Sequence, residues 1–237
     1  MPGRLAVILA RGGSKRLPGK NLFRLSGESL VGLAVKKALK SKCFSNVLVS
    51  TDSPEIAEEA KKAGGWVPFL RPSDLASDSA TSTKALLHAV NWVIQTHPEN
   101  FPEVTVLLQP TSPLLKSQHI DQAISLFENH SFTSLSSMCS VKERPEWMFH
   151  LEPDFKAVPR DQICFVHPSQ KLPVFYHENG AIYIIKTRHF LENHSLYDIN
   201  NHGGFIMEPL FSIDIDSELD FLFSEFLVTS GKVNPHE

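Results

Sequence analysis

The stretch that decides the fold is Leu5-Ala-Val-Ile-Leu-Ala10, followed at once by Arg11-Gly-Gly-Ser-Lys-Arg-Leu-Pro-Gly-Lys-Asn21. The first six residues form a continuous apolar run, which is typical of a strand buried on both faces of a sheet. The residues that follow combine three glycines with four basic side chains. A buried strand that ends in a basic, glycine-rich loop indicates an α/β sheet with a ligand at the carboxyl ends of its strands.

The remaining sequence alternates short apolar runs with segments of helical periodicity. The predicted strands cover residues 47–49, 66–70, 104–108, 181–185 and 211–216, and the predicted helices cover 28–40, 54–63, 78–95, 120–127 and 217–227. Ser53 and Pro54 are typical of a helix start, and Gly64-Gly65 of a helix end. This alternation predicts a doubly wound, mostly parallel sheet with helices on both faces.

The pattern changes between about residue 140 and residue 180. This stretch is rich in aromatic and charged residues, and five prolines interrupt it: Pro145, Pro153, Pro159, Pro168 and Pro173. A chain of 237 residues is the length of one large domain. We therefore expect a single domain over residues 1–237, with residues 140–180 as an inserted lobe that serves a ligand site or dimerisation.

The composition excludes several classes of protein. Apolar residues make up 42% and charged residues 21%, which is ordinary for a soluble globular protein. The formal net charge of −3 gives no basic field for nucleic acid or an anionic membrane. The apolar run at the N-terminus is too short for a signal segment. Three distant cysteines without a CxxC motif predict neither a disulfide framework nor a zinc site. We expect a cytoplasmic protein that binds neither nucleic acid nor membrane.

The loop after the first strand carries the strongest functional signal. Residues 1–27 contain six basic side chains and no acidic one. Glycines let backbone N–H groups approach an anion, and Lys or Arg neutralises it, so a polyphosphate is the expected ligand. The alternative is a solvated basic turn. A Walker A motif needs glycine where Pro18 stands, and the glycine spacing does not fit a Rossmann fingerprint.

Two carboxylates stand in the segment Asp214-Ile215-Asp216. On a strand they would share a face, and Mg²⁺ uses few protein oxygens while sharing the rest with phosphates. The alternative is that Asp216 caps the final helix. Together with the basic loop, the pair predicts a Mg²⁺ that helps to neutralise a triphosphate.

Three further polar segments follow or precede predicted strands. Residues 71–78 would read a base or ribose, or form a turn and a helix cap. Residues 109–113 would read a sugar, or cap the next helix. Asn179-Gly180 suits a hairpin turn. There is no HExxH or Gly-x-Ser-x-Gly motif in the sequence, so neither zinc catalysis nor a hydrolase triad is supported.

Taken together, these segments resemble the CMP-N-acylneuraminate synthetase family, also called acylneuraminate cytidylyltransferases. The matching stretches are 6–21, 49–52, 70–72, 75–78, 108–114, 179–183 and 212–216, in the family's order. The resemblance implies a nucleotidyltransferase fold, a homodimer and dependence on Mg²⁺. It also implies transfer of CMP from CTP to the anomeric hydroxyl of a nonulosonic acid, a nine-carbon 2-keto sugar acid, with release of pyrophosphate.

The resemblance further implies roles for individual residues. The catalytic residues would be Arg11, Lys20, Asp214 and Asp216, of which Asp214 and Asp216 would also hold the metal. The residues in contact with CTP would be Arg11, Gly12, Ser14, Lys20, Asn21, Arg71, Ala80 and Ser82. The residues in contact with the sugar would be Gln109, Tyr183 and Lys171. Within this set, Arg11 and Lys20 would hold the triphosphate and Asn21 the ribose.

The sequence departs from the family's pattern in the sugar-facing half. Ser169 stands where the family usually has an arginine, and His177 and Glu178 stand where many members have a basic residue. A carboxylate substrate needs cationic donors, which Lys171, Arg160 or Arg144 would supply. Legionaminic, pseudaminic or another nonulosonic acid is therefore nearly as well supported as N-acetylneuraminic acid. A transferase for the eight-carbon acid Kdo shares the fold and is an alternative, but residues 12–14 and 108–112 resemble the acylneuraminate group more closely.

Two other classes of protein also remain as alternatives. A metal-dependent glycosyltransferase also uses an Asp-x-Asp motif, but there the motif typically lies mid-chain rather than near the end of the sequence. A non-catalytic nucleotide-binding subunit would not need Lys20 together with both carboxylates. Both alternatives therefore fit the sequence less well than a synthetase does.

Overall fold

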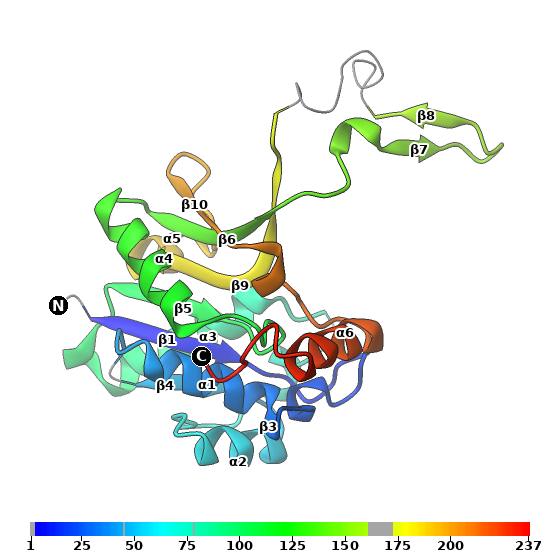
Figure 1. Ribbon diagram of the computed structural model, residues 1–237. Coiled ribbons are helices and arrows are strands. Elements are labelled where there is room, and N and C mark those ends of the chain that lie inside the picture. The colour runs from blue at the N-terminus through cyan, green and yellow to red at the C-terminus, as the bar shows by residue number, and fades with distance from the viewer. Residues whose placement is uncertain (1–2, 45, 78, 161–172) are drawn as a thin grey trace.

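The computed structural model describes residues 3–44, 46–77, 79–160 and 173–237. Among these residues the main sheet has six strands in the order β10-β6-β9-β5-β1-β4 (Figure 1). The strands are β1 Arg4–Leu9, β4 Val47–Ser50, β5 Val104–Leu108, β6 Ser134–Ser140, β9 Tyr176–Lys186 and β10 His202–Ile206. Strand β9 runs antiparallel to β5 and β6, and the other pairs are parallel. The predicted doubly wound, mostly parallel sheet is confirmed.

Helices cover both faces of this sheet (Figure 1). On one face α1 (Leu30–Lys40), α2 (Pro54–Lys62) and α4 (Ser117–Asn129) pack in one hydrophobic cluster, and on the other face α3 (Ser82–Thr96) and α5 (Thr187–Asn193) pack in a second. Strand β1 supplies both clusters, because Ala6 and Ile8 point to the first and Leu5 and Val7 to the second.

A third hydrophobic cluster lies beside the sheet. It joins Leu227 of the C-terminal helix α6 (Glu218–Thr229) to Leu17 of the basic loop, to Leu25 in the short hairpin of β2 (Arg24–Leu25) and β3 (Glu28–Ser29), and to Leu30 and Leu33 of α1. Ile215 is completely buried in this cluster. The cluster therefore fastens the C-terminal segment against the basic loop, at the edge where the ligand is expected.

The helix boundaries follow from local capping. The Ser53 side chain accepts a hydrogen bond from the Ile56 N–H, and the chain leaves α2 through Gly64 at φ +94°, as predicted. Helix α1 begins two residues later than predicted, because Glu28 and Ser29 belong to β3 and Ser29 is the cap. Helix α3 begins at Ser82 under a Thr81 cap rather than near residue 78, which lies outside the described residues. Helix α4 extends beyond the predicted 120–127 at both ends.

Two predicted strands are wrong. Residues 66–70 make only two isolated bridges, Leu48 with Trp66 and Thr51 with Leu70, because Pro68 has no N–H to donate to a ladder. Residues 211–216 leave the 3-10 helix Pro209–Phe211 as irregular backbone. Their apolar–polar alternation has another cause, since Ile213 and Ile215 pack into the third cluster while Asp214 and Asp216 do not.

The hairpin turn expected at Asn179-Gly180 is also wrong, because both residues lie inside the long strand β9. The strand is irregular there, with a shift in its register against β6 and Gly180 at φ +76°. Asn179 is buried; it accepts a hydrogen bond from the Ser137 hydroxyl and donates one to the Ser212 hydroxyl at 2.9 Å. It therefore ties β9 to β6 and to the segment that carries the two aspartates.

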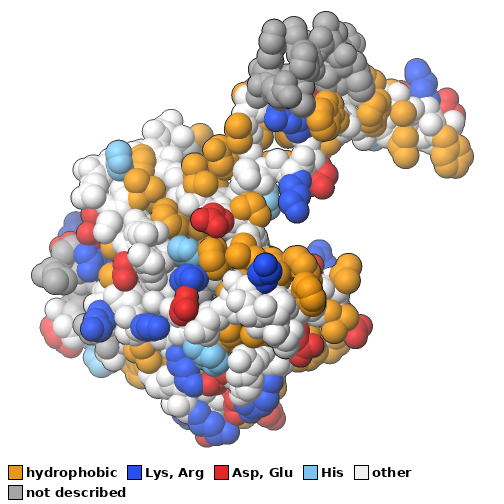
Figure 2. All heavy atoms as spheres, in the orientation of Figure 1, with side chains coloured by type: hydrophobic (Ala, Val, Ile, Leu, Met, Phe, Trp, Pro, Cys, Tyr) orange, Lys and Arg blue, Asp and Glu red, His pale blue; other side chains and the backbone are white. Residues whose placement is uncertain are grey.

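Between β6 and β9 the chain leaves the sheet. Strands β7 (Phe149–Leu151) and β8 (Ala157–Pro159) form a two-stranded arm that projects from the main body (Figure 1). Figure 2 shows apolar side chains along this arm, and Phe155 is 87% exposed. The role expected for residues 140–180, in the ligand site or in dimerisation, stays a prediction. None of the helices in the described ranges is both long enough and apolar enough to cross a membrane.

Candidate functional site

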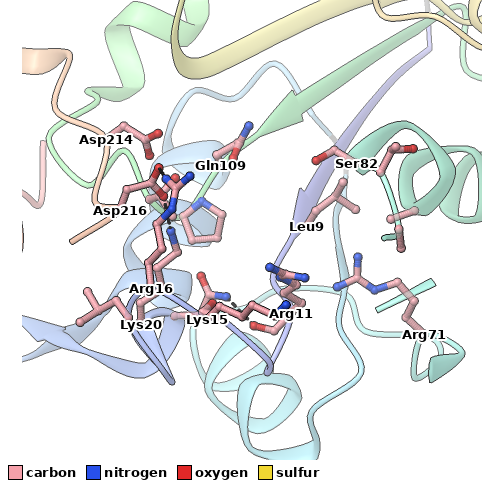
Figure 3. A pocket seen from close by; sticks show the side chains of 18 of the residues that line it. Leu9, Arg11, Lys15, Arg16, Lys20, Arg71, Ser82, Gln109, Asp214 and Asp216 are labelled. Atoms are coloured by element: carbon pink, nitrogen blue, oxygen red, sulfur yellow. Dashed lines mark hydrogen bonds and ion pairs between the residues drawn. The ribbon is translucent and has the colours of Figure 1, made fainter. Parts of the chain in front are cut away.

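A cavity of about 500 Å³ lies at the carboxyl ends of β1 and β5 (Figure 3). After β1 the chain adds β4 on one side, and it then returns to add β5 on the other side, so the cavity lies where the order of the strands reverses. This is the usual place for a ligand in an open α/β sheet. Ten of the predicted residues line it: Arg11, Ser14, Lys20, Asn21, Arg71, Ala80, Ser82, Gln109, Asp214 and Asp216.

Three predicted residues are not among those that line the cavity. Gly12 belongs to the basic loop, and its N–H donates to Asp52 Oδ1 at 3.0 Å. Tyr183 lies farther along β9, opposite Leu107 of β5, and Leu107 is part of the cavity wall. Lys171 lies outside the described residues.

The basic loop is held in place by bonds from behind it. Besides the Gly12–Asp52 bond, the Asn21 side-chain amide donates to the Arg11 carbonyl at 2.9 Å. A Cβ atom at Gly12 would come within 3.2 Å of the Ser53 Cβ, so a larger residue would push the loop away from α2. The loop backbone is thus fixed, while Arg11, Lys15 and Lys20 border the cavity (Figure 3).

Arg71 contributes a further cation from the opposite wall (Figure 3). The residue is only 6% exposed, and its Nη2 lies 3.8 Å from Asp52 Oδ1. Burial lowers its pKa, and the neighbouring Asp52 opposes that shift. Within the described residues, its Nε and Nη2 atoms have no hydrogen-bond partner. A buried donor without an acceptor costs about 1–3 kcal/mol, so this side chain is suited to an acceptor supplied by a ligand.

The two aspartates lie together across the cavity from Arg71 (Figure 3). Asp216 accepts hydrogen bonds from Lys20 Nζ at 2.9 Å and Arg16 Nη1 at 2.7 Å, and Lys20 also donates to the Ile215 carbonyl at 2.7 Å. Asp216 does not cap α6, since Ser217 does so. The alternative reading of Asp216 as a helix cap is therefore wrong.

Asp214 has no such cationic partner at hydrogen-bond distance among the described residues. Partial desolvation raises its pKa, the Asp216 charge adds to that effect, and Thr111 opposes it with a hydrogen bond. Its Oδ2 atom lies over β9, 3.6 Å from where a Cβ on Gly180 would stand. An added cation would relieve the unfavourable charge on Asp214.

The aspartate pair fits a magnesium ion better than a metal held by protein alone. Within the described residues there is no group of three or more His, Cys, Asp or Glu side chains suited to a metal. Mg²⁺ commonly uses one or two carboxylates and completes its shell with water and substrate phosphates. Asp214 and Asp216, beside a cavity lined with cations, offer that donor set.

Two residues that organise the site were not predicted to do so: Asp52 had no individual role, and Thr111 was considered only as part of the segment 109–113. Asp52 accepts a hydrogen bond from the Gly12 N–H and lies 3.8 Å from Arg71. Its position directly after a buried strand is the feature of the sequence that could have indicated this role. Thr111 accepts the Ile215 N–H at 2.8 Å through its carbonyl. Because this bond joins two distant segments, no local pattern in the sequence indicates it.

Comparisons with known proteins agree with this geometry. The family model described as "Cytidylyltransferase" matches residues 5–224. A CMP-N,N'-diacetyllegionaminic acid synthase of Legionella pneumophila is 35% identical over 234 residues, which cover 94% of this chain and 95% of that protein. An N-acylneuraminate cytidylyltransferase of Escherichia coli is 32% identical over 218 residues, covering 92% of this chain but 50% of that longer protein.

A solved structure shares the fold. A CMP:2-keto-3-deoxy-manno-octonic acid synthetase complexed with CTP superposes with a TM-score of 0.70 at 17% identity, over 96% of this chain and 99% of that one. The family expected from the sequence motifs is confirmed by a match that extends through the basic loop, the sheet and the aspartate pair. This chain belongs to the cytidylyltransferase family.

Proposed function

We propose that this protein transfers CMP from CTP to the anomeric hydroxyl of a nonulosonic acid and releases pyrophosphate. The observation that carries the proposal is the cavity at the carboxyl ends of β1 and β5. It gathers the cations Arg11, Lys20 and Arg71 with the carboxylates of Asp214 and Asp216, and Lys20 lies 2.9 Å from Asp216. The negatively charged oxygens of a triphosphate need cations around them. A carboxylate pair would repel those oxygens unless a metal ion lay between the carboxylates and the triphosphate.

The chemistry follows from this distribution of charge. The anomeric oxygen of the acceptor attacks the α-phosphorus, the bond from that phosphorus to the β-phosphate oxygen breaks, and pyrophosphate leaves. Negative charge collects on the phosphate oxygens, so fixed cations aimed at them contribute most to the rate. We assign that role to Arg11 and Lys20, and Arg16 and Lys15 line the same cavity.

Lys20 has a second function in this proposal. In the free protein its amine is held by Asp216 and by the Ile215 carbonyl. Bound Mg²⁺ would be held by Asp214 and Asp216 and would supply positive charge to the triphosphate. Lys20 would then be free to pair with the phosphate oxygens instead of Asp216, so that the charges of the site would be paired in both states.

The nucleoside is assigned to the other wall of the cavity. The Arg71 Nε and Nη2 groups, which have no hydrogen-bond partner among the described residues, are assigned to acceptor atoms of the base, and Ala80 leaves room beside Ser82 at the start of α3. The buried Asn21, beside the basic loop, is assigned to the ribose. These positions support a pyrimidine nucleotide lying between the basic loop and α3.

The acceptor is proposed as a class. Relatives of similar identity carry names that refer to different sugar acids, diacetyllegionaminic acid in one and N-acylneuraminic acid in the other. Gln109 lines the cavity and Tyr183 lies beyond it, and both are assigned to the acceptor. N-acetylneuraminic, legionaminic and pseudaminic acids are the candidates.

The projecting arm is assigned to a homodimer interface. Phe149, Leu151 and Phe155 are 50%, 61% and 87% exposed, and a monomer would leave this apolar surface in water. Light scattering should give twice the chain mass, and Phe155→Asp should shift the protein toward the monomer. A monomeric wild-type protein at micromolar concentration would contradict this assignment.

The function is tested by measuring pyrophosphate release from CTP with Mg²⁺ and a panel of sugar acids that contains the three nonulosonic acids and Kdo. We expect acceptor-dependent pyrophosphate and an equal amount of CMP-sugar with at least one nonulosonic acid, and little product when UTP or ATP replaces CTP. Binding of CTP without turnover on any acceptor would favour a non-catalytic nucleotide-binding protein instead.

A further inference from the structure

A cluster of two phenols and a carboxylate lies on the sheet outside the cavity. The Tyr197 hydroxyl donates to Glu178 Oε2 at 2.8 Å. Tyr183 interacts with both of these side chains, and its ring meets the Tyr197 ring edge to face at 6.4 Å between centroids. We call Glu178, Tyr183 and Tyr197 the acceptor surface.

The acceptor surface adjoins the aspartate side of the cavity. Glu178 and Tyr183 both belong to β9, on either side of Gly180, over which the Asp214 carboxylate lies. Tyr183 pairs with Leu107, whose side chain lines the cavity. Glu178 and Tyr183 are partly exposed and Tyr197 is 39% exposed, so a molecule that extends out of the cavity along β9 meets this surface.

The surface is supported from beneath by a second set of polar contacts. The His202 ring nitrogens pair with Ser134 Oγ at 2.7 Å and Ser136 Oγ at 3.0 Å, and the imidazole ring lies 5.3 Å from the Tyr197 ring. Ser134 Oγ also accepts the Asp198 N–H at 2.8 Å, directly after Tyr197. Tyr197 is therefore held in position by β6 and β10.

Hydrogen-bond accounting shows what this surface offers to a ligand. An ionised carboxylate only accepts hydrogen bonds, so Tyr197 directs its proton at Glu178, and a Tyr183–Glu178 bond uses the Tyr183 proton in the same way. Burial, with the nearby Glu178 charge, raises the pKa of Tyr183 to about 12, which keeps this phenol neutral. The groups left for a ligand are therefore oxygen lone pairs.

A surface of this kind discriminates between the two ends of a sugar acid. The carboxylate of the acceptor would be repelled by Glu178, and it would offer no proton to the phenol oxygens. Hydroxyl and amide N–H groups would each satisfy a lone pair. Orientation would therefore follow from charge repulsion at one end and from hydrogen-bond donation at the other.

We propose that Glu178, positioned with Tyr183 and Tyr197, determines acceptor specificity by requiring hydrogen-bond donors at the end of the acceptor remote from its carboxylate. This inference rests on the proposed function and deepens it. It explains why Glu178 stands at a position where a cation would be expected for a carboxylate-bearing substrate: this part of the site does not face the carboxylate.

The test compares Glu178→Gln and Tyr197→Phe with Glu192→Gln, an exposed glutamate on α5 that serves as the matched control. Steady-state constants are measured for CTP and for two acceptors, an N-acetylated nonulosonic acid and its N-deacetylated form with an ammonium group. For Glu178→Gln we expect the acceptor KM to rise about five- to tenfold and the CTP KM to stay within twofold. The increase should be larger for the ammonium form, which loses a carboxylate partner.

Tyr197→Phe, which keeps the ring and removes the hydroxyl, should raise the acceptor KM in the same direction without changing the CTP KM. Equal increases in both KM values, or unchanged acceptor KM values in a folded variant, would overturn the inference while leaving the proposed function in place. Absence of turnover by the wild-type protein on every acceptor would instead remove the proposed function, and this inference with it.

Discussion

The nucleotide wall, which comprises Arg71, Asn21 and the basic loop, is built differently from the acceptor surface. The nucleotide wall uses buried or backbone-anchored groups: Arg71 is almost fully buried, Asn21 is bonded to the Arg11 carbonyl, and the Gly12 N–H is held by Asp52. The acceptor surface uses half-exposed side chains that contact mainly one another, such as Tyr197 with Glu178.

The difference bears on how specificity is set on each side. Buried groups leave little freedom, so one nucleotide is favoured and a substitution there affects the whole site. Substitution of partly exposed side chains on a fixed strand lowers the free energy of unfolding only slightly, because water replaces the contacts that are lost. We expect close relatives to share the nucleotide and to differ in the sugar acid. The variants that follow test this contrast from the largest expected effect to the smallest.

Asp214→Asn should have the largest effect, because Asp214 lies at the junction of the two sides. We expect kcat to fall about 100-fold or more, the scale seen when one preorganised electrostatic group is lost. Because the pKa of Asp214 is raised in the folded protein, removing its charge should leave the melting temperature unchanged or slightly higher. Glu218→Gln, on the first turn of α6, is the matched control. Wild-type turnover in Asp214→Asn would show that this carboxylate has no part in the reaction.

Lys20→Met should weaken the nucleotide side. The loss of a charge-assisted contact is worth roughly 1.5–3 kcal/mol, which corresponds to about a tenfold to hundredfold rise in the Kd for CTP. Calorimetric titration with CTP measures it, with Lys61→Met on the exposed face of α2 as the control. The acceptor KM should change much less. A CTP affinity equal to that of the control would contradict the placement of the triphosphate.

Arg71→Met should separate stability from function. The variant removes a buried guanidinium whose Nε and Nη2 make no hydrogen bond within the part of the chain that the structure describes, so we expect the free protein to be as stable as the wild type or more stable. The CTP KM should nevertheless rise about tenfold, the effect of losing a hydrogen bond to a charged group. Thermal melts with and without CTP measure both quantities. A variant that loses stability and keeps its CTP KM would show that Arg71 serves the fold alone.

His119→Gln should have the smallest effect. It should change the stability of the packing around the aspartate segment, and not the binding of CTP or of the acceptor. The His119 ring packs 5.1 Å from Phe211, just before that segment, and burial lowers its pKa to about 4. The unfolded chain then takes up the proton first as the pH falls below about 6.5, so stability is lost between pH 6.5 and 4. At pH 5.5 this loss is about 1 kcal/mol.

His119→Gln keeps an acceptor for the Lys116 N–H and removes the titrating ring. Unfolding measured at pH 7.5 and 5.5 should therefore show a smaller pH dependence in the variant than in the wild type. Identical pH dependence in the two proteins would mean that His119 is not held neutral in the fold.

The sequence predicted the nucleotide side better than the acceptor side for a physical reason. The run from Leu5 to Asn21 is a local pattern in which strand, glycines and cations are consecutive, and its position in the fold follows from the strand. The aspartate pair was recognised although its predicted strand is wrong, because Ile213 and Ile215 alternate with it for the sake of the third cluster.

The acceptor surface could not be predicted in the same way. Tyr197 reaches Glu178 only because α5 and the loop after it return the chain to the sheet, and His202 arrives from a further strand. Asn179 suggested a turn, yet a register shift in β9 buries it beneath the site. Contacts of this kind depend on tertiary packing and leave no local pattern.

The central claim is that cations and the carboxylate pair converge on one nucleoside triphosphate. Calorimetric titration of CTP into wild-type protein and Asp214→Asn, each with and without Mg²⁺, tests it most directly. We predict that Mg²⁺ tightens CTP binding at least tenfold in the wild type and has little effect in Asp214→Asn, because only the wild type must offset the repulsion between carboxylate and phosphate. The same Mg²⁺ enhancement in both proteins, or no CTP binding by the wild type, would contradict the account.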